Sequence, residues 1–449
     1  MILDFWENEK PPLEWEKGLL KVLPKKGDLS MPGNYRGIML LETCYKIVAI
    51  ILHDRLRPIA ESLDHEAQCG FRPGRGCVDG VFTVKMAMMK RKEHGLESWI
   101  LFLDLVKAFD RVPRELLWQV LEIFGIPAKL ILLLKSLHAR VEVKFVINDV
   151  TKSIESIIGV KQGDILGPLL FIFYLASVMI SWRNAYDRPV CIFHTKFDDV
   201  LTGRRYNTKR NIEEFSLPDS EYADDTAVLF TSRESTETYV PLLLNHFIRF
   251  GLEIHVATDE KPSKSEILFV AAPKRIYKNQ STYESCNLSN IVLPKGTHLP
   301  IVDCFCYLGS FLTRECNDNV DVDARINSAS RAFGKLRKCL FASTSISYKA
   351  KKFVYECIIL AILLYGAEHW CLTESLFRKL RVFHARCVRA MCRVNRLHTR
   401  VYRIRTSDLL NRLSLQSIDS YVNRFQLCCM VMLCHSMGPQ RLPQKNVTS

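Results

Sequence analysis

Three aspartates stand out because the segments around them predict that their side chains lie close together. Asp104 directly follows residues 99–103, an uncharged apolar run that is typical of a buried strand. Asp224 and Asp225 occupy a tight turn between two strand-like segments. A carboxylate at the end of a buried strand is costly unless it is paired, hydrogen-bonded or bound to a metal ion. If the two strands are neighbours, the three carboxylates converge at one end of a sheet.

Carboxylate oxygens in such a cluster suit Mg²⁺, which prefers octahedral oxygen coordination, and Mn²⁺ is an alternative ion. Two ions about 4 Å apart would stabilise the attacking and the leaving oxygen of an in-line phosphoryl displacement, which is polymerase and nuclease chemistry. The competing interpretation is an ordinary acidic turn. Asp198 and Asp199 also follow an aromatic residue, but they lie in a polar segment without flanking strands, and we interpret them as a solvated loop.

The segments that must position these aspartates are a mixture of helices and strands. Residues 183–220 resemble an irregular polar insertion, and residues 271–300 resemble a loop with weak strand content. From residue 320 to about 437 the helical period dominates. The sequence therefore predicts an α+β body followed by an all-helical region. Apolar spacing predicts helices at residues 44–57, 81–92, 113–124, 129–137, 168–182 and 237–250, and strands at residues 99–105, 140–148, 222–230, 266–270 and 305–312.

The positive charge of the chain is concentrated in this helical region. The 449 residues contain 62 basic and 48 acidic side chains, a net charge of +14. Residues 1–320 hold 40 basic and 41 acidic side chains, whereas residues 321–449 hold 22 and 7, a net charge of +15. This asymmetry favours a carboxy-terminal region that contacts a polyanion, most simply nucleic acid, and a solvated basic surface is the alternative.

The sequence also indicates where in the cell the protein is located. The sequence predicts no transmembrane helix, and its acidic start lacks the basic region of a signal peptide. We therefore expect an intracellular protein that is neither secreted nor bound to a membrane, in which the 16 cysteines do not form disulfides. Two groups lack the spacing of a metal site and are interpreted as buried thiols: Cys304 with Cys306, and Cys428 and Cys429 with Cys434 and His435.

Taken in order, the motifs of this chain resemble those of a reverse transcriptase from non-LTR (LINE-type) retrotransposons. Motifs A, B and C of that family resemble residues 102–112 (FLDLVKAFDRV), 159–171 (GVKQGDILGPLLF) and 222–225 (YADD). The resemblance covers about residue 9 to the end, and so many motifs in one order are not a coincidence. The fingers motifs resemble residues 25–28 (KKGD), 34–38 (NYRGI) and 68–76 (QCGFRPGRG). Motif D resembles residues 251–254 (GLEI) with 264–266 (KSE), and motif E resembles residues 305–310 (FCYLGS). The helical region that follows resembles residues 364–370 (LYGAEHW) and 383–389 (FHARCVR).

The resemblance implies a right-hand polymerase with fingers at residues 1–98, a palm at residues 99–310 and a helical thumb with an extension at residues 311–449. The palm would include fingers elements at about residues 113–160 and the insertion at about residues 183–220. The implied activity is RNA-directed DNA polymerisation. Its partners would be an RNA template, a DNA primer and dNTPs, and no protein partner is indicated. Nuclear location is expected from the resemblance alone.

Roles for the acidic and aromatic residues of motifs A and C also follow from the resemblance. Asp104 and Asp224 would be the main ligands of two Mg²⁺ ions, and Asp225 would complete the acidic cluster. Phe109 matches the bulky residue that excludes a ribose 2′-hydroxyl, because an aromatic wall leaves no room for the extra oxygen. The competing interpretation of Phe109 is a buried aromatic in the turn from strand to helix.

Four more residues match positions that would contact the incoming nucleotide. Gln162 and Gly163 match the motif B pair beside the nucleotide and template, where glycine permits close backbone approach. Arg72 matches a fingers arginine expected on the triphosphate, because its planar fork suits phosphate oxygens. Lys264 matches the motif D lysine near the departing pyrophosphate. For Arg72 and Lys264 an ordinary surface cation is the competing interpretation.

Three departures from the family pattern favour a second hypothesis. Gly167 stands where motif B usually has serine, and Asp164 puts a charge near a triphosphate site. The chain also begins almost at the fingers, without the endonuclease segment of intact elements, as in a partial copy. The alternative is therefore a catalytically inactive, nucleic-acid-binding remnant. An RNA-templated RNA polymerase is disfavoured by Phe109 and by the turn at residues 222–225.

Overall fold

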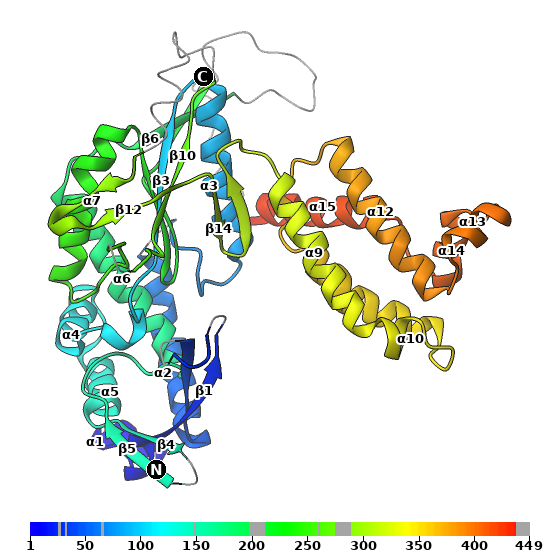
Figure 1. Ribbon diagram of the computed structural model, residues 1–449. Helices are drawn as coiled ribbons and strands as arrows, with labels where there is room; N and C mark the ends of the chain where they lie inside the picture. The colour runs from blue at the N-terminus through cyan, green and yellow to red at the C-terminus, as the bar shows by residue number, and fades with distance from the viewer. Residues whose placement is uncertain are drawn as a thin grey trace, which may run out of the picture. The chain divides into compact units, whose positions relative to one another are not determined.

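The chain folds into two compact units, Met1–Val302 and Asp303–Ser449, each with its own core. A computed structural model (Figure 1) describes residues 1–25, 28–31, 34–63, 67–147, 150–196, 212–258, 261–273 and 289–436. The predicted solvated pair Asp198 and Asp199 lies outside these residues. The predicted boundary at residue 310 falls at the start of β15 (Ser310–Thr313), in a hairpin that belongs to the second unit.

The first unit is built around a five-stranded sheet in the order β13-β10-β3-β9-β8. Its centre is β3 (Ser98–Leu103), in which every residue is buried because the strand is apolar on both faces. Helix α3 (Cys77–Glu93) packs on β3 and β8, and α7 (Arg233–Arg249) packs on β9. The other strands are β8 (Asp219–Tyr222), β9 (Asp225–Phe230), β10 (Glu266–Val270) and β13 (Ile301–Val302).

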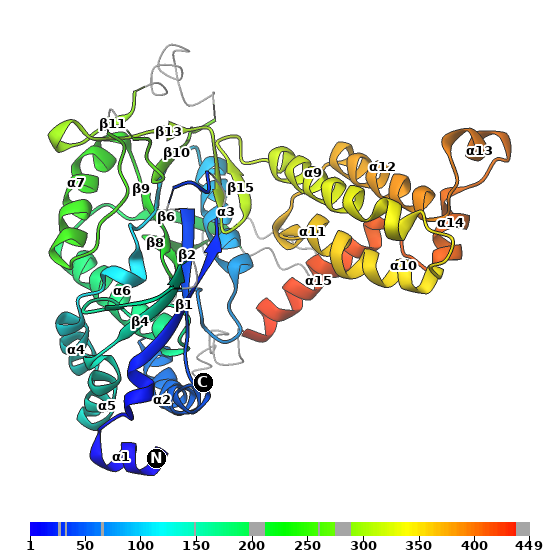
Figure 2. The same cartoon turned by 60° about the horizontal axis from the view of Figure 1, so that its bottom comes forward.

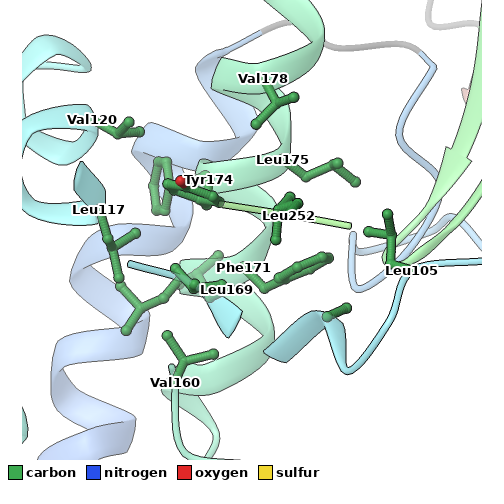
Figure 3. Packing of buried hydrophobic residues seen from close by; sticks show 14 of the residues in the cluster. Leu105, Leu117, Val120, Val160, Leu169, Phe171, Tyr174, Leu175, Val178 and Leu252 are labelled. Atoms are coloured by element: carbon green, nitrogen blue, oxygen red, sulfur yellow. The ribbon is translucent and has the colours of Figure 1, made fainter. Parts of the chain in front are cut away.

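Helix α6 (Leu166–Ala185) is the centre of the helical part of this unit. It contacts α2 (Thr43–Ser62), α4 (Arg114–Ile123) and α7, and Figure 3 shows its side chains Phe171, Tyr174 and Leu175 packed among neighbouring elements. Contrary to our expectation from the sequence, α6 is long and apolar enough to cross a membrane. However, 72% of its apolar window is buried inside the protein, which is the pattern of a core helix.

A second, four-stranded sheet lies in the order β2-β1-β4-β5. Strands β1 (Lys17–Pro24) and β2 (Tyr35–Leu40) form an antiparallel hairpin, and β1 also pairs in parallel with β4 (Glu142–Ile147). The edge strand β5 (Val150–Glu155) was not predicted, because its sequence VTKSIE is largely polar and lacks an apolar run. Small elements beside this sheet are α1 (Ile2–Asn8), η1 (Leu13–Glu16) and α5 (Ala128–Ala139).

Several other predicted boundaries are wrong. Helix α2 continues through Pro58, where the sequence predicted its end. The insertion predicted to be irregular contains a hairpin of β6 (Cys191–Lys196) and β7 (Ile212–Leu217), and its residues 197–211 lie outside the described chain. By contrast, the weak strand content predicted within the loop at residues 271–300 is confirmed by a short antiparallel pair. That pair is β11 (Ile291–Val292) with β12 (His298–Leu299), joined through η6 (Pro294–Gly296).

The second unit is a hairpin followed by helices, as Figure 2 shows. The strand predicted at residues 305–312 is in fact two strands, β14 (Cys304–Tyr307) and β15, joined by a turn at Leu308 and Gly309 with positive φ. Its helices are α9 (Asn319–Leu336), η7 (Arg337–Phe341), α10 (Tyr348–Val354), η8 (Tyr355–Leu360), α11 (Ala361–Leu363), η9 (Ala367–His369), α12 (Glu374–Met391), α13 (Arg396–Val401), α14 (Thr406–Leu413) and α15 (Ile418–Ser436).

The interpretation of two cysteine groups as buried thiols is wrong for three of their members. Cys306 and Cys428 are exposed, and Cys304 is half-buried. A two-stranded hairpin has no second layer over all of its side chains, so alternation in β14 does not imply burial. The side chains of Cys429, Cys434 and His435 lie outside the described part of the chain.

Candidate active site

The register of the five-stranded sheet brings the three predicted aspartates to one end of it. Leu103 pairs with Thr226 in the antiparallel β3–β9 ladder, so Asp104 and Asp225 are the next residues along each strand. In the β8–β9 hairpin Tyr222 pairs with Asp225, which leaves Ala223 and Asp224 as the two-residue turn. Strand pairing alone therefore places three carboxylates from two sequence regions around one point.

Two of these carboxylates, Asp224 and Asp225, have raised pKa values. Desolvation by the surrounding protein, and then the charges of Asp224 and Asp104, raise the pKa of Asp225 to about 6, although the residue as a whole is exposed. Burial and Asp104 also raise the pKa of Asp224, against the opposing charges of Arg36 and Lys25. Repulsion of this kind is relieved by a bound cation.

The donor set therefore fits a hard divalent cation held by Asp104, Asp224 and Asp225. Within the residues that the structure describes, no group of three His, Cys, Asp or Glu side chains is already close enough to hold a metal ion. The three carboxylates would thus have to draw closer around an ion.

Two residues that precede β10, Lys264 and Ser265, contact Asp104. The backbone N–H of Asp104 donates to Ser265 Oγ at 3.0 Å. Lys264 Nζ lies 3.8 Å from Asp104 Oδ2, with the lysine side chain 67% exposed. The structure therefore places Lys264 beside a carboxylate of the cluster, where a solvated ion pair contributes little to stability. Because the side chain is exposed, its ammonium is also available to a charged substrate.

The turn that carries Asp224 is supported by Gln68, a residue to which the sequence analysis assigned no role. Gln68 is 3% exposed, and its Oε1 accepts hydrogen bonds from Gly70 N at 2.7 Å and Ala223 N at 3.1 Å. Ala223 has φ +54, a left-handed conformation that costs energy for a residue other than glycine. The amide oxygen of Gln68 therefore helps to hold a strained turn.

The backbone around Gln68 adds to this support. Glu221 exchanges hydrogen bonds with the segment, donating to Ala67 O at 2.7 Å and accepting from Cys69 N at 2.8 Å. Gly70 packs so closely that a Cβ there would lie 2.7 Å from Ala223 N, which explains the glycine. Gln68 thus forms an isolated parallel β-bridge with Glu221 beside the turn.

Behind the turn lies a buried ionic network that the sequence analysis did not foresee. Asp219 and Glu221 in β8 are fully buried, and Arg183 of α6 contacts both, at 2.6 Å and 3.0 Å. Burial and the neighbouring Asp219 raise the pKa of Glu221. Arg188 also lies 3.6 Å from Asp219. These residues fall in the region predicted to be an irregular polar insertion. That prediction is wrong for the strands β6, β7 and β8, and it did not foresee the burial of Asp219 and Glu221.

Phe109 and the motif B loop meet beside the sheet end. Phe109 lies in η3 (Ala108–Arg111), half-buried, with its ring 4.8 Å from that of Phe171 in α6. Its carbonyl accepts a hydrogen bond from Val160 N at 2.9 Å. This bond ties motif A to the start of motif B. Both interpretations of Phe109, a packed aromatic and a wall of the site, are compatible with this position.

The Gln162-Gly163 pair docks against β2. Met39 N donates to Gln162 O at 2.8 Å. Gly163 has φ +109, and a Cβ there would lie 2.6 Å from Met39 O, so the close approach of loop and strand requires glycine. The glycine predicted to admit a nucleotide is therefore also needed to admit β2.

Asp164 does not face a substrate site, which removes one reason to doubt activity. It is 5% exposed, and its Oδ2 accepts a hydrogen bond from Tyr45 Oη of α2 at 2.6 Å. Lys161, 3% exposed, lies with its Nζ 3.4 Å from the same hydroxyl and 4.4 Å from the ring centroid. Burial raises the pKa of Asp164 and lowers that of Lys161 to about 8, while each charge opposes the shift of the other. The trio anchors both sides of the Gln162-Gly163 pair.

Arg72, the arginine predicted to bind phosphate, contacts the segment that supports the turn. Arg72 Nη1 donates to Gln68 O at 3.3 Å, and the side chain lines a hollow between α2, residues 68–73 and α6. Two other exposed cations, Arg36 and Lys25, act on the carboxylates instead, because their charges lower the pKa of Asp224. Both belong to the amino-terminal fingers motifs, so the sequence held a signal that we did not assign to individual residues.

The first unit thus has an α+β fold with three acidic residues at one end of a mainly antiparallel sheet, beside a second sheet and a glycine-containing loop. This is the arrangement expected of a nucleotidyl-transferring polymerase. The chain belongs to the reverse transcriptase family. Residues 23–268, more than half of the chain, match the family model described as "Reverse transcriptase (RNA-dependent DNA polymerase)". The predicted resemblance and the predicted right-hand α+β fold are thereby confirmed.

Proteins from transposable elements are among its relatives. The "Probable RNA-directed DNA polymerase from transposon BS" of Drosophila melanogaster is 25% identical over 92% of this chain and 42% of its own length. The "Transposon TX1 uncharacterized 149 kDa protein" of Xenopus laevis is 35% identical over 34% and 12%. The chain thus spans less than half the length of these curated relatives. Among solved structures, apo telomerase from Candida tropicalis has a TM-score of 0.44 at 10% identity, covering 97% of this chain and 69% of the other.

Proposed function

We propose that this chain catalyses RNA-templated DNA synthesis by adding dNTPs to the 3′ end of a DNA primer. The observation that carries the proposal is the register that sets Asp104 beside Asp225, with Asp224 in the adjoining turn. Family membership supports the reaction class. The inactive remnant is the alternative outcome of the test below.

The reaction forms a bond between the primer 3′ oxygen and the α-phosphorus of the dNTP. The bond from that phosphorus to the bridging oxygen breaks, and pyrophosphate leaves while the hydroxyl proton passes to solvent. Two Mg²⁺ ions held by Asp104, Asp224 and Asp225 would supply the positive charge that lowers the barrier, and Mn²⁺ could replace them. The chain's own part is to make these carboxylates converge, as the sheet register and the Gln68 contact do.

The nucleotide would lie between the carboxylates and the motif B loop. Phe109 would exclude a ribose 2′-hydroxyl, and the Gln162-Gly163 pair would contact the base pair being formed. Arg36 and Lys25 are the cations that we assign to the triphosphate, because their charges already act on the acidic cluster. Two further cations, Arg72 and Lys264, could join them once substrate is bound.

The polyanionic partners would be an RNA template and a DNA primer. The net charge of +15 over residues 321–449 supports phosphate contacts by the second unit. We include an intracellular, nuclear location in the proposal, on family resemblance alone.

The test is primer extension on an oligo(dT)-primed poly(rA) template with Mg²⁺. We expect wild type to extend the primer with dTTP and not with UTP, and the Asp224→Asn/Asp225→Asn variant to be inactive. Asp323→Asn is the matched control, because Asp323 is an exposed aspartate on α9 that is ion-paired with Lys379. If wild type binds the primed template but never extends it, the protein is an inactive remnant.

A further inference from the structure

The end of α12, the helices α13 and α14 and the segments between them carry a dense run of arginines. Residues 389–412 contain seven arginines, no lysine and no glutamate, and Asp408 is their single acidic residue. In Figure 2, α13 stands at one end of the second unit. We call residues 389–412 the arginine tip.

The charge of the arginine tip is not compensated within the part of the chain that the structure describes. Six of its arginines are exposed, and none of them makes an ion pair with a described residue: Arg393, Arg396, Arg400, Arg403, Arg405 and Arg412. The carboxylate of Asp408 instead caps α14 by accepting from the backbone N–H of Arg405.

Other cations of the same unit are paired, so the difference is local. Lys379 on α12 contacts Asp323 at 2.7 Å, and Arg381 contacts both Glu374 and Asp419. A protein surface usually intersperses charges of both signs, because like charges repel. An uncompensated arginine cluster therefore indicates a polyanionic partner.

Helix α13 also exposes apolar and aromatic side chains beside these arginines. No residue of α13 is buried, and Leu397, Val401 and the following Tyr402 are 66%, 62% and 70% exposed. The Tyr402 ring lies 6.0 Å from the ring of His398. The helix starts at a side-chain cap, where Asn395 Oδ1 accepts from His398 N at 2.7 Å. A capped helix that contributes nothing to the core and is followed by an exposed tyrosine has the properties of a contact surface.

We propose that the arginine tip binds single-stranded RNA, with arginines on the phosphates and Tyr402 stacked on an unpaired base. Guanidinium groups match phosphate oxygens bidentately, and aromatic rings stack on bases that are not paired. An acidic peptide would use the charges but not the ring. A lipid surface would need a longer amphipathic helix than the six residues of α13. The choice of RNA as the polyanion rests on the proposed function.

The test measures binding of the full chain to a fluorescent 20-nucleotide oligo(U), without dNTPs, by anisotropy at several salt concentrations. In Arg396→Gln/Arg400→Gln/Arg403→Gln, three phosphate contacts are lost. The slope of log K against log salt should then fall by about 2, which weakens binding by about 100-fold at 0.1 M salt. The matched control is Lys335→Gln/Arg337→Gln/Lys338→Gln, which removes three exposed charges from α9 and η7 of the same unit. We expect it to weaken binding at most a few-fold.

The stacking part of the proposal has its own variants. Tyr402→Ala should weaken oligo(U) binding by about tenfold with an unchanged salt slope, and Tyr402→Phe should retain wild-type affinity, because it keeps the ring. Binding to a 20-base-pair duplex should not respond to Tyr402→Ala. Equal effects on single strand and duplex would overturn the proposal. So would arginine variants no weaker than the control, or a Tyr402→Ala effect found with phosphatidylglycerol vesicles and not with oligo(U).

This readout separates the inference from the proposed function. The inactive Asp224→Asn/Asp225→Asn chain should bind oligo(U) as wild type does. A chain that fails to polymerise can therefore still meet the prediction, and an active chain can still fail it. In the arginine, tyrosine and control variants none of the substituted side chains is buried, so these variants should unfold at the wild-type temperature.

Discussion

Replacement of Gln68 by methionine should uncouple the catalytic turn from the rest of the molecule. Methionine has nearly the same length and shape, but its thioether sulfur is only a weak hydrogen-bond acceptor. Its thioether would leave two buried donors, Gly70 N and Ala223 N, without the partner that lies at 2.7 Å and 3.1 Å in the native protein. A buried donor without a partner costs about 1–3 kcal/mol. The turn can recover part of this cost by moving Ala223 N toward water.

The expected loss of stability is therefore about 2 kcal/mol, which lowers the Tm by about 4–8 °C for a domain of this size. Because Asp224 follows Ala223 directly, movement of the turn also shifts a predicted metal ligand. A misplacement of about 1 Å at such a site costs about 100-fold in rate. We therefore expect kcat in primer extension to fall by at least tenfold, with a smaller change in KM for the primed template.

The control is Gln68→Glu, which keeps an oxygen acceptor for both donors. It should retain more stability than Gln68→Met at neutral pH. The reasoning is refuted if Gln68→Met loses stability but retains wild-type kcat, because Gln68 would then support only the fold. It is also refuted if the variant loses neither.

Three further predictions concern buried groups. Gly167→Ser, which restores the residue usual in motif B, should lower stability by about 1–3 kcal/mol and reduce extension, because a Cβ there would lie 2.5 Å from Lys161 O. Tyr45→Phe should lower Tm and raise KM for dNTP, because Asp164 would lose its 2.6 Å hydrogen bond and the motif B loop its anchor. Burial lowers the pKa of His138 from 6.5 to about 3. Below pH 6.5 this histidine is therefore protonated in the unfolded chain but stays neutral in the folded chain. Folding should thus lose about 2 kcal/mol between pH 6.5 and 5, a loss that His138→Phe abolishes.

Each of these predictions has a matched control or a contradicting result. Extension by Gly167→Ser above the wild-type rate would show that the helix start can shift to admit a side chain. Tyr348→Phe, at a half-exposed tyrosine of the second unit, should change neither Tm nor KM. Denaturant titrations at pH 5 and 7 measure the His138 effect, and His398→Asn, at an exposed histidine, should leave the pH dependence intact. An equal pH dependence in wild type and His138→Phe would assign it to other groups.

The sequence alone determined the parts of this protein that depend on local pattern. The apolar run before Asp104 and the alternation around Asp224 predicted a strand and a hairpin, and the structure has both. Motif order predicted the family correctly. Periodicity predicted the helical carboxy-terminal region, because a buried helical face repeats every three to four residues whatever it packs against.

The sequence could not show which distant groups meet. In the sequence, Gln68 is an ordinary polar residue in a glycine-rich loop. In the fold, its Oε1 accepts a hydrogen bond from the backbone N–H of Ala223, 155 residues away. Asp164 reads as a charge near substrate until Tyr45 of α2 is seen to bind it in the interior. Lys264 and Arg72 match family positions, but packing decides which oxygen each side chain reaches.

The division has one physical reason. Helix and strand propensity, turn chemistry and apolar period act over a few residues, so they are written in neighbouring letters of the sequence. Convergence of Asp104 with Asp225 needs a strand register, and burial of Asp219 and Glu221 against Arg183 needs a helix packed behind that strand. Those contacts join residues tens to hundreds of positions apart, and the free energy that selects them comes from the whole packed core. The sequence thus identified the chemistry, whereas tertiary structure decided which side chains support it and which merely lie near it.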